Sequence, residues 1–571
     1  MTAAAPYYPL PTPTEQVNTL REQAALDPAI ALAHLRQYLP QGQDPHALPE
    51  PLLHAAIDVG LGESAYADTL AFIRERARPW ADAEVEAARL EPFIIAEVGR
   101  LQVQLRAAQV LLAQAASAPA EQRPVAALQA QVQAQRTAVL LSEKLFELSG
   151  SRATLAEFGL ARHWQQAQRP RPLPALRQNV LALGQYALSV RPGVPLPPAG
   201  ERAADAASAL QLARYLATEF ASGAAERDRE RRLPHAELDR LSASGLLALT
   251  VPKAFGGLDA SVATVAEVIA LLSAADGSIG QIPQNHFYAL EVLRVNGTAA
   301  QQRRLFAEAQ AGVRFGNALA EIGTKTSQHR TTSLTPDGTG NRINGRKFYA
   351  TGALFAQRVP TSVIDPEGRQ QMAFVHREAS GLRIIDDWSG MGQRTTGSGS
   401  VVFEQVYVDA DDVVPFQASF ERPTAVGPVA QLLHAAIDTG LARGAFDRAR
   451  QLAEPHDDLV AYSLGELAVH VAATEALLRV AGEHVQAARE APDSARVAAA
   501  SLAVAEVRAL STDTSLAAGN LLVELAGSGA GLDRYWRNAR THTLHDPVRW
   551  KYHAIGNYHL NGELPPRKGY L

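Results

Sequence analysis

The sequence predicts an α+β fold that is mainly α, with one β region set between helical regions. Good helix formers fill most of residues 1–168 and most of the chain from residue 431 onward, and apolar residues recur there every three or four positions. Glycine and turn signals are instead concentrated between residues 316 and 416. A third observation, a long internal repeat, places a second helical bundle ahead of the first.

Taken in order, the chain of 571 residues divides into five parts. Seven of the 34 prolines fall between Arg169 and Gly200, which predicts a stiff linker with one short helix inside it. Twelve of the 41 glycines lie in 316–416, between alternating runs such as SVVFEQVYV, which predicts an antiparallel sheet, barrel-like or sandwiched. The predicted parts are an N-terminal helical bundle (1–168), the linker (169–200), a helical domain (201–315), a β domain (316–420) and a C-terminal helical bundle (421–571).

Composition excludes several functional classes. The chain has no cysteine, so disulfides, thiolate metal sites, iron–sulfur clusters and a cysteine nucleophile are all excluded. With 54 basic and 59 acidic residues, no overall field favours nucleic acid or an anionic membrane. The first residues lack the pattern of a signal peptide, and no segment approaches the roughly 20 apolar residues of a membrane span. We therefore expect a soluble, cytoplasmic protein.

The repeat joins the two ends of the chain. LLHAAIDVGL at 52–61 matches LLHAAIDTGL at 432–441 in nine of ten positions. Two further collinear matches follow, of 99–112 with 465–478 and of 147–164 with 524–536. Two copies are too few for a solenoid, so the pattern predicts a duplicated bundle. Its structural interpretation is that the extra copy covers a surface that another subunit's bundle would otherwise cover.

The strongest local feature is the segment 537–562, which holds four of the 16 histidines. Asp546 and the proline after it predict a helix start and Gly556 its end, so His542 and His545 would lie in the loop before a helix N-terminus. The positive potential there favours neutral imidazoles, which can donate to a developing anion or take up a proton. A metal site lacks an evident third ligand, and a pair of loop-capping histidines is the structural alternative.

Two further segments carry candidate chemistry. His286 lies in DGSIGQIPQNHFYAL, after a Gly/Pro stretch that predicts a helix break, and its alternative role is that of a hydrogen-bonded core residue. In DWSGMGQRTTGSGSVVFE, Arg394, Thr396 and Ser398 accompany glycine-rich backbone that a flat ligand can approach closely. No GxGxxG opens a helix after a strand and no GxxxxGK[ST] is present, so neither Rossmann nor P-loop chemistry is supported.

Several of these motifs together resemble one family. From about Glu226 to Arg567 the chain resembles the acyl-CoA dehydrogenase fold, in which a helical domain, a β domain and a four-helix bundle follow one another. More narrowly, it is similar to the sulfur-acquisition oxidoreductases related to dibenzothiophene monooxygenase. The motifs that carry this resemblance are LTVPKAFGG, DGSIGQIPQNHF, NALAEIGTKT, GRKFYATGALFA, DDWSGMGQRTTGSG and WRNARTHTLHDPVRWKYHAIGNYHLNG.

The resemblance implies a two-component flavin-dependent monooxygenase. Reduced FMN would come from a separate NAD(P)H flavin reductase, and a small organosulfur or related substrate would be oxidised through a C4a-(hydro)peroxyflavin. His286, His542 and His545 match the family's histidines at the reactive edge of the flavin. The flavin-contacting positions match Asn317, Tyr349, Thr351, Trp388, Arg394, Thr396 and Ser398.

Two alternatives stay open. An FAD-dependent acyl-CoA dehydrogenase-like oxidoreductase would need a carboxylate base over the acyl α-carbon, and the matching C-terminal segment has no Glu. A degenerate, non-catalytic flavoprotein scaffold is the other alternative. We expect no metal, no nucleic acid and no membrane partner, and the extra bundle implies a homodimer.

The two copies of the bundle differ at positions where relatives have arginines. RARPW-like and GSRAT-like segments of relatives resemble those that reach a flavin phosphate. The N-terminal copy keeps both, with Arg78 and Arg152, whereas the C-terminal copy has AEPHDD and GSGAG. Only the C-terminal copy keeps THTLHDP. We hypothesise that Arg78 and Arg152 bind the flavin phosphate while the other copy supplies His542 and His545, the alternative being that the N-terminal copy is a non-binding spacer.

Overall fold

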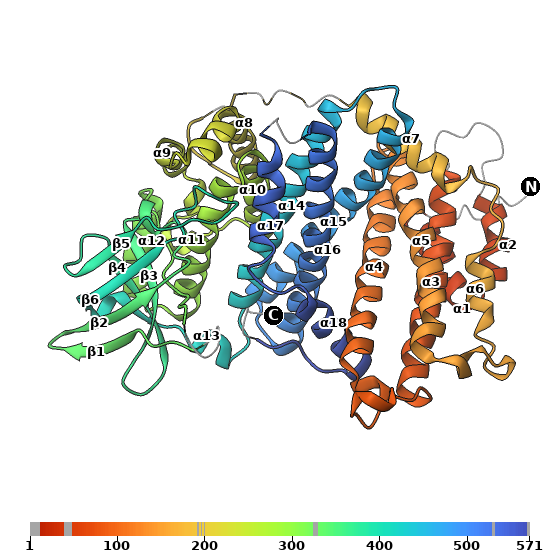
Figure 1. Cartoon of the computed structure of the whole chain (residues 1–571), viewed down its shortest axis with the longest axis horizontal. Helices are drawn as coiled ribbons and strands as arrows, with labels where there is room; N and C mark the ends of the chain where they lie inside the picture. The colour runs from red at the N-terminus through yellow and green to blue at the C-terminus, as the bar shows by residue number, and fades with distance from the viewer. Residues whose placement is uncertain are drawn as a thin grey trace, which may run out of the picture. The chain divides into compact units, whose positions relative to one another are not determined.

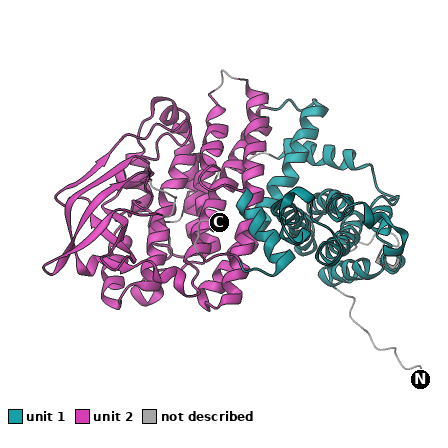
Figure 2. Cartoon of the chain, turned by 60° about the horizontal axis from the view of Figure 1, so that its bottom comes forward, with its two compact units in different colours: residues 1–190, 453–477, 549–564 teal, residues 191–452, 478–548, 565–571 magenta. Residues whose placement is uncertain are grey.

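The computed structural model describes residues 12–38, 48–190, 200–323, 329–527 and 531–567, together with 193, 195, 197 and 198. It confirms a mainly helical α+β fold with one sheet (Figure 1). The chain forms two compact units, and each consists of segments that are distant in sequence (Figure 2). Among the described helices, none combines the length and the apolar character that crossing a membrane requires.

Unit 1 contains residues 1–190, 453–477 and 549–564. A helix, α7, lies inside the proline-rich region, as predicted. Its Gly184 approaches α15 so closely that a Cβ there would lie 1.6 Å from the carbonyl oxygen of Ala461. The helices of this unit are α1 (Pro13–Leu26), α2 (Pro28–Tyr38), α3 (Glu50–Glu75), α4 (Pro92–Ser117), α5 (Arg123–Ser149), α6 (Ala161–Ala167), α7 (Leu176–Ser189), the first part of α15 (Asp458–Glu490) and α18 (Arg549–Asn561).

The helix pair α4–α18 shows the same close packing. Gly99 of α4 faces Gly556 of α18, and a Cβ on Gly556 would lie 1.7 Å from the carbonyl oxygen of Ile95. Gly556 was expected to end a helix, but it lies inside α18, where the absence of a side chain lets two backbones touch. The helix also begins at Arg549, later than the predicted start at Asp546.

Unit 2 contains residues 191–452, 478–548 and 565–571. Long apolar helices pack pairwise here, above all α14 against α16 and α10 against α14. The helices are α8 (Ala206–Glu230), α9 (His235–Ala243), α10 (Val262–Ala275), α11 (Gly277–Asn296), α12 (Ala299–Gln310), α13 (Ala418–Glu421), α14 (Val426–Leu452), the second part of α15, α16 (Ser494–Ala526) and α17 (Asp533–His542).

The β region of unit 2 forms a single seven-stranded sheet in the order β5-β6-β2-β1-β3-β4-β7. Neighbouring strands are antiparallel except β1 and β3, which pair in parallel through Ser333 and Ile364, so the sheet is mixed where a purely antiparallel one was expected. Its buried face is formed by Val, Ile, Phe and Ala side chains at alternating positions. The strands are β1 (Ser333–Asp337), β2 (Gly340–Lys347), β3 (Arg358–Ile364), β4 (Gln370–His376), β5 (Leu382–Ile385), β6 (Ser400–Asp409) and β7 (Val413–Pro415).

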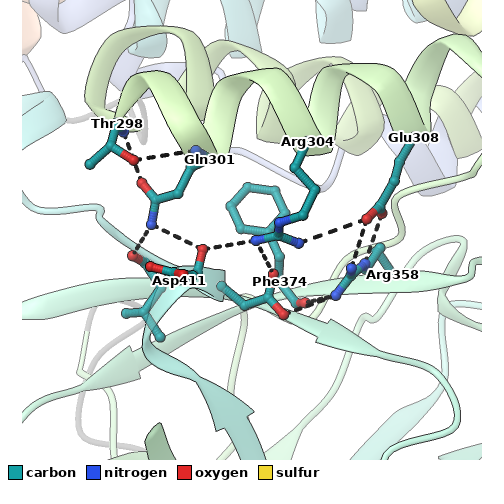
Figure 3. Close-up of polar contacts among 9 residues, drawn as sticks. Thr298, Gln301, Arg304, Glu308, Arg358, Phe374 and Asp411 are labelled. Atoms are coloured by element: carbon teal, nitrogen blue, oxygen red, sulfur yellow. Dashed lines mark hydrogen bonds and ion pairs between the residues drawn. The ribbon is translucent and has the colours of Figure 1, made fainter. Parts of the chain in front are cut away.

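Helix α12 is joined to this sheet by a row of polar contacts (Figure 3). Arg358 of β3 pairs with Glu308 at 2.8 Å and donates to the carbonyl oxygen of Phe374 at 3.1 Å. Gln301 donates to the carbonyl oxygen of Asp411 at 3.1 Å. The ion pair and the hydrogen bonds satisfy these charged and polar groups. They therefore fix the sheet against the helical layer of unit 2.

Candidate active site

The THTLHDP segment places its two histidines differently from the prediction. His542 is the last residue of α17, at the C-terminal end of a helix, and His545 lies in the turn that follows. A helix N-terminus therefore does not account for a neutral His542. Packing against α14 and α16 does, because it buries His542 to 1% exposure while leaving the side chain of His545 44% exposed.

His542 lies at the centre of a buried hydrogen-bonded chain. Its Nδ1 is 2.5 Å from Oδ1 of Asp438, a fully buried carboxylate on α14. Asp438 is also paired with the guanidinium of Arg508 from α16, which is 2% exposed. On its other side, Nε2 of His542 is 3.0 Å from Nδ1 of His434, one turn before Asp438 on α14. We refer to Arg508, Asp438, His542 and His434 as the buried chain.

His545 packs on the end of this chain. Its ring centroid is 4.3 Å from that of His434, with the ring planes inclined by 31°. The next residue, Asp546, accepts a 2.9 Å hydrogen bond from Gln431 of α14. The three imidazoles thus lead from a fully buried carboxylate to a half-exposed edge.

The hydrogen bonds fix which ring nitrogens carry protons. A carboxylate only accepts, so the hydrogen of His542 lies on Nδ1, and Nε2 of the neutral ring accepts from Nδ1–H of His434. Burial lowers the pKa of His542 below its usual range, although Asp438 opposes that shift. Burial, with His545, His542 and Arg508 nearby, lowers the pKa of His434 well below its usual value. Both rings are therefore neutral at pH 7.

His286 has a different environment. It lies within α11, which continues through the Gly/Pro stretch expected to break it, with Pro283 inside the helix. The backbone N–H of Phe315 donates to Nδ1 at 3.1 Å, so Nε2–H donates to the carbonyl oxygen of Leu247 at 2.8 Å. Burial lowers its pKa to about 4. With both nitrogens engaged, His286 ties α11 to two neighbouring segments, and no hydrogen bond among the described residues links it to the buried chain.

The predicted hydroxyl residues gather beside the sheet. Thr351 and Ser398 are 2.7 Å apart through their Oγ atoms, and Thr396 is 2.7 Å from Ser398. Arg394 in the same segment is half-buried and makes no hydrogen bond or ion pair with any residue that the structure describes. An unpaired guanidinium beside buried hydroxyls keeps its donors available for an anionic or carbonyl group.

Two aromatic rings border this group. Tyr349, 50% exposed and with a positive φ of 55°, lies 6.2 Å from Trp388 in an edge-on arrangement. The indole N–H of Trp388 donates to the carbonyl oxygen of Gln393 at 2.9 Å. Asn317 donates to the carbonyl oxygen of Tyr349 at 3.2 Å. The seven residues matched to flavin contacts therefore lie on neighbouring loops of the β region.

A hydrogen bond joins the loop that carries Arg394 to α17, the helix that ends at His542. The backbone N–H of Gln393 donates to Oδ1 of Asn538 at 2.6 Å, and Asn538 lies one turn before His542 on α17. A Cβ on Gly392 would lie 2.0 Å from the carbonyl oxygen of Arg537, so the loop reaches α17 only because this residue is glycine. Within the described ranges, no cluster of three or more His, Asp or Glu is arranged to hold a metal ion.

Arg78 and Arg152 lie in unit 1, and both are exposed. Their segments meet at Phe158, whose ring lies 5.1 Å from the guanidinium carbon of Arg76 and 5.6 Å from that of Arg152. Arg78 makes no hydrogen bond or ion pair with any described residue. The role of both arginines toward a flavin stays a prediction.

Sequence analysis missed His434, Asp438 and Arg508. The signal for the first two was present, because LLHAAIDTGL places His and Asp four residues apart, on one face of a helix. Nothing in the sequence pattern distinguished Arg508 from other helix arginines.

Comparisons with known proteins agree with this fold. The acyl-CoA dehydrogenase N-terminal domain matches residues 206–312, and the acyl-CoA dehydrogenase C-terminal domain matches residues 52–169, in the N-terminal part of the chain. The class that fold and site define is an oxidoreductase with the acyl-CoA dehydrogenase fold.

Dibenzothiophene monooxygenase from Rhodococcus qingshengii is 31% identical over 391 residues, covering 62% of this chain and 94% of that protein. The "Probable FMNH2-dependent monooxygenase SfnC" of Pseudomonas putida is 31% identical over 390 residues, covering 62% and 96%. FMN-bound TdsC from Paenibacillus sp. A11-2 superposes with a TM-score of 0.61 at 30% identity, over 64% of this chain and all of that one. The chain belongs to this monooxygenase family.

Proposed function

We propose that this protein is the oxygenase component of a two-component system, using reduced FMN from a separate NAD(P)H flavin reductase to oxidise a small organosulfur or related compound. The observation that carries the proposal is the pair of neutral, buried imidazoles of His542 and His434, joined through α17 to the loop that carries Arg394 and the hydroxyl group. The names of the relatives, dibenzothiophene monooxygenase and an FMNH2-dependent monooxygenase, support the cofactor and the substrate class.

The residues present fit a flavin. Tyr349 and Trp388 provide an aromatic border for a flat ring system, and Thr351, Thr396 and Ser398 provide hydroxyls for its carbonyl and nitrogen edge. The guanidinium of Arg394, with no partner in the described chain, is available to a carbonyl or phosphate, and Asn317 supports the backbone of Tyr349. When bound, reduced flavin supplies the two electrons with which dioxygen is activated.

The chain's own residues then handle protons. His542 and His434 are neutral and linked by a 3.0 Å hydrogen bond, so they can take up or return a proton at neutral pH. The half-exposed His545 lies between them and solvent and is the ring best placed to contact a ligand. An acyl-CoA dehydrogenase would need a carboxylate free to act as base, whereas the nearby Asp546 accepts from Gln431.

A flavin titration tests the proposal. Fluorescence quenching is followed with oxidised and reduced FMN and FAD in parallel, and the Arg394→Ala variant serves as a control for the proposed contact. Tight binding of reduced FMN, weakened about 10-fold or more by Arg394→Ala, is expected from loss of a charge-assisted contact. A preference for oxidised FAD, with bleaching by an acyl-CoA, would instead indicate a dehydrogenase, and no binding of either flavin would indicate a non-catalytic scaffold.

The N-terminal bundle is proposed to serve in place of a neighbouring subunit's bundle, so that the protein is a homodimer. This rests on the 52–61 and 432–441 repeat and on the C-terminal-domain match at 52–169. Light scattering should give twice the chain mass, and a single species at four times the chain mass would contradict it.

The exposed Arg78 and Arg152 are proposed to bind the flavin phosphate. Arg152→Ala should then weaken reduced-FMN binding, with Arg177→Ala, at an exposed position of α7, as a matched control outside this segment. Binding as tight as in the wild type would refute the role of Arg152.

A further inference from the structure

We propose that the buried chain is a proton relay in which His434 receives a proton and passes one on to His542, and Asp438, held by Arg508, stabilises the charge on His542. His434, Asp438 and Arg508 then support the reaction without themselves contacting the flavin. The inference rests on the proposed monooxygenase function for its purpose, but its geometry stands on the polypeptide alone.

The relay follows from the order of hydrogen bonds. Asp438 accepts from Nδ1–H of His542 at 2.5 Å, and Nε2 of His542 accepts from Nδ1–H of His434 at 3.0 Å. This leaves Nε2 of His434 as the unprotonated end, and it makes no hydrogen bond with any residue that the structure describes. The buried chain therefore has one free acceptor, on the ring against which His545 packs.

Proton transfer along this path balances without any redox step. A proton binds Nε2 of His434, the Nδ1 proton of that ring moves to Nε2 of His542, and the N–H bond broken on one ring is formed on the next. His434 is neutral again, and His542 becomes an imidazolium paired with the carboxylate of Asp438. One positive charge has moved inward by one ring, and the reverse sequence returns the proton.

Arg508 explains why the proton would stop at His542. Its guanidinium is paired with Asp438 and cannot be deprotonated in proteins, so the carboxylate stands between a fixed cation and the Nδ1–H of His542. The other titratable groups around His434 are His542, His545 and Asp546. Asp438 therefore acts as a fixed anion that positions and stabilises His542, and it does not take up the proton itself.

The N-terminal copy provides an internal comparison. His54 and Asp58 occupy the positions matched to His434 and Asp438 in the repeat, and both are buried. Asp58 forms ion pairs with two arginines, Arg169 at 2.8 Å and Arg171 at 2.7 Å. Neither ring nitrogen of His54 has a hydrogen-bond partner among the described residues.

Both arginines come from HWQQAQRPRP, the segment that replaces THTLHDP in this copy. A guanidinium cannot pass a proton at neutral pH, so the same His–Asp pair has no relay here. The described chain therefore carries one His–Asp pair joined through His542 and one in which Arg169 and Arg171 pair with the aspartate instead.

The test compares His434→Gln with the matched His54→Gln. Glutamine keeps a polar side chain of similar length but cannot titrate near neutrality. We expect His434→Gln to lower the rate of product formation about 100-fold, the order of a general acid–base contribution, and to remove one ionisation from the pH–rate profile. Reduced-FMN affinity should change less than about 2-fold, and His54→Gln should leave rate and profile unchanged. Wild-type rate and pH profile in His434→Gln would overturn the relay.

A second measurement needs neither flavin nor activity. Imidazole 15N NMR of the flavin-free protein, with signals assigned by their loss in His434→Gln and His542→Gln, reports which nitrogen carries the proton. We expect His542 and His434 both protonated on Nδ1 at pH 7. A proton on Nε2 of His542 would refute the relay even if the enzyme is active. Correct tautomers in a protein that does not bind reduced FMN would refute the proposed function and leave the relay geometry supported.

Discussion

Replacing Asp438 by Asn tests how much the buried chain contributes to stability. The substitution keeps size and shape but removes the anion between Arg508 and His542, both about 2% exposed or less. Removing one partner of a buried ion pair leaves the other charge uncompensated, which costs about 3–5 kcal/mol in the free energy of unfolding. The loss should fall at the upper end of that range, because the hydrogen bond to His542 loses its charged acceptor as well.

The matched control is Asp493→Asn. Asp493 pairs with Arg496 on the surface, where the side chains are 48% and 54% exposed, and its role as N-cap of α16 is one that Asn fills equally well. An exposed pair contributes about 0–1 kcal/mol, so this variant should unfold nearly as the wild type does.

The assay is urea unfolding followed by far-UV circular dichroism. Hydrogen exchange of α14, α16 and α17 identifies which transition is the unfolding of unit 2. Because a two-unit chain need not unfold in one step, we compare midpoints at a common slope rather than extrapolated free energies. Equal midpoints for Asp438→Asn and Asp493→Asn would refute the assignment of Asp438 as the compensating charge of a buried network.

Three further predictions concern other parts of the chain. Burial lowers the pKa of His286 from 6.5 to about 4, so the ring is neutral in the folded protein at pH 7. Its contribution to the free energy of unfolding is complete above pH 6.5 and falls by about 3 kcal/mol as the pH drops toward 4. In chemical unfolding measured across that range, His286→Gln should flatten the slope by about one proton, and an unchanged slope would contradict it. Gly556→Ala should destabilise unit 1 by about 1–3 kcal/mol or more, since the new Cβ would lie 1.7 Å from the carbonyl oxygen of Ile95, and a wild-type thermal midpoint would count against that close packing. Lys347→Met should lower the free energy of unfolding by about 3–5 kcal/mol, because it leaves the buried carboxylate of Glu321 without its cation; this ammonium helps to lower the pKa of Glu321 to about 2. Lys347→Met combined with Glu321→Gln should recover part of the loss, and no recovery in urea midpoints would argue against the pair.

Local patterns predicted the helical regions and the β region and singled out His542 and His545, but they did not reveal the residues that position His542. Composition and periodicity depend on neighbours in sequence, which suffices for α14 or for the alternating strands. Asp438 and Arg508 are 70 residues apart and meet only when α14 packs on α16. The hydrogen-bond partner of His434, His542, is 108 residues away, so in the sequence His434 stands out only as part of the repeat. Contacts of this separation have no local signature.

Errors in the predicted helix boundaries have the same origin. Pro283 and the glycines before it carry a helix-breaking signal, yet α11 runs through them because the surrounding helices bury almost every residue of that turn. Gly556 is a typical helix-ending residue, but at that position tertiary packing needs a residue without a side chain. Tertiary contacts therefore overrode local propensity at both places.

The composition of unit 1 has a consequence for synthesis. Arg74 donates a 2.8 Å hydrogen bond to the carbonyl oxygen of Leu560, 486 residues later in the chain, and Arg136 pairs with Glu466 across 330 residues. At about 5–20 residues per second, the ribosome needs roughly 25–100 s to make the chain between Arg74 and its partner. During that time the surfaces of the first helices that later pack against α15 and α18 stay uncovered. The N-terminal bundle, although made first, is therefore completed last, and a chain released early would expose the apolar surface through which nascent proteins aggregate or engage chaperones.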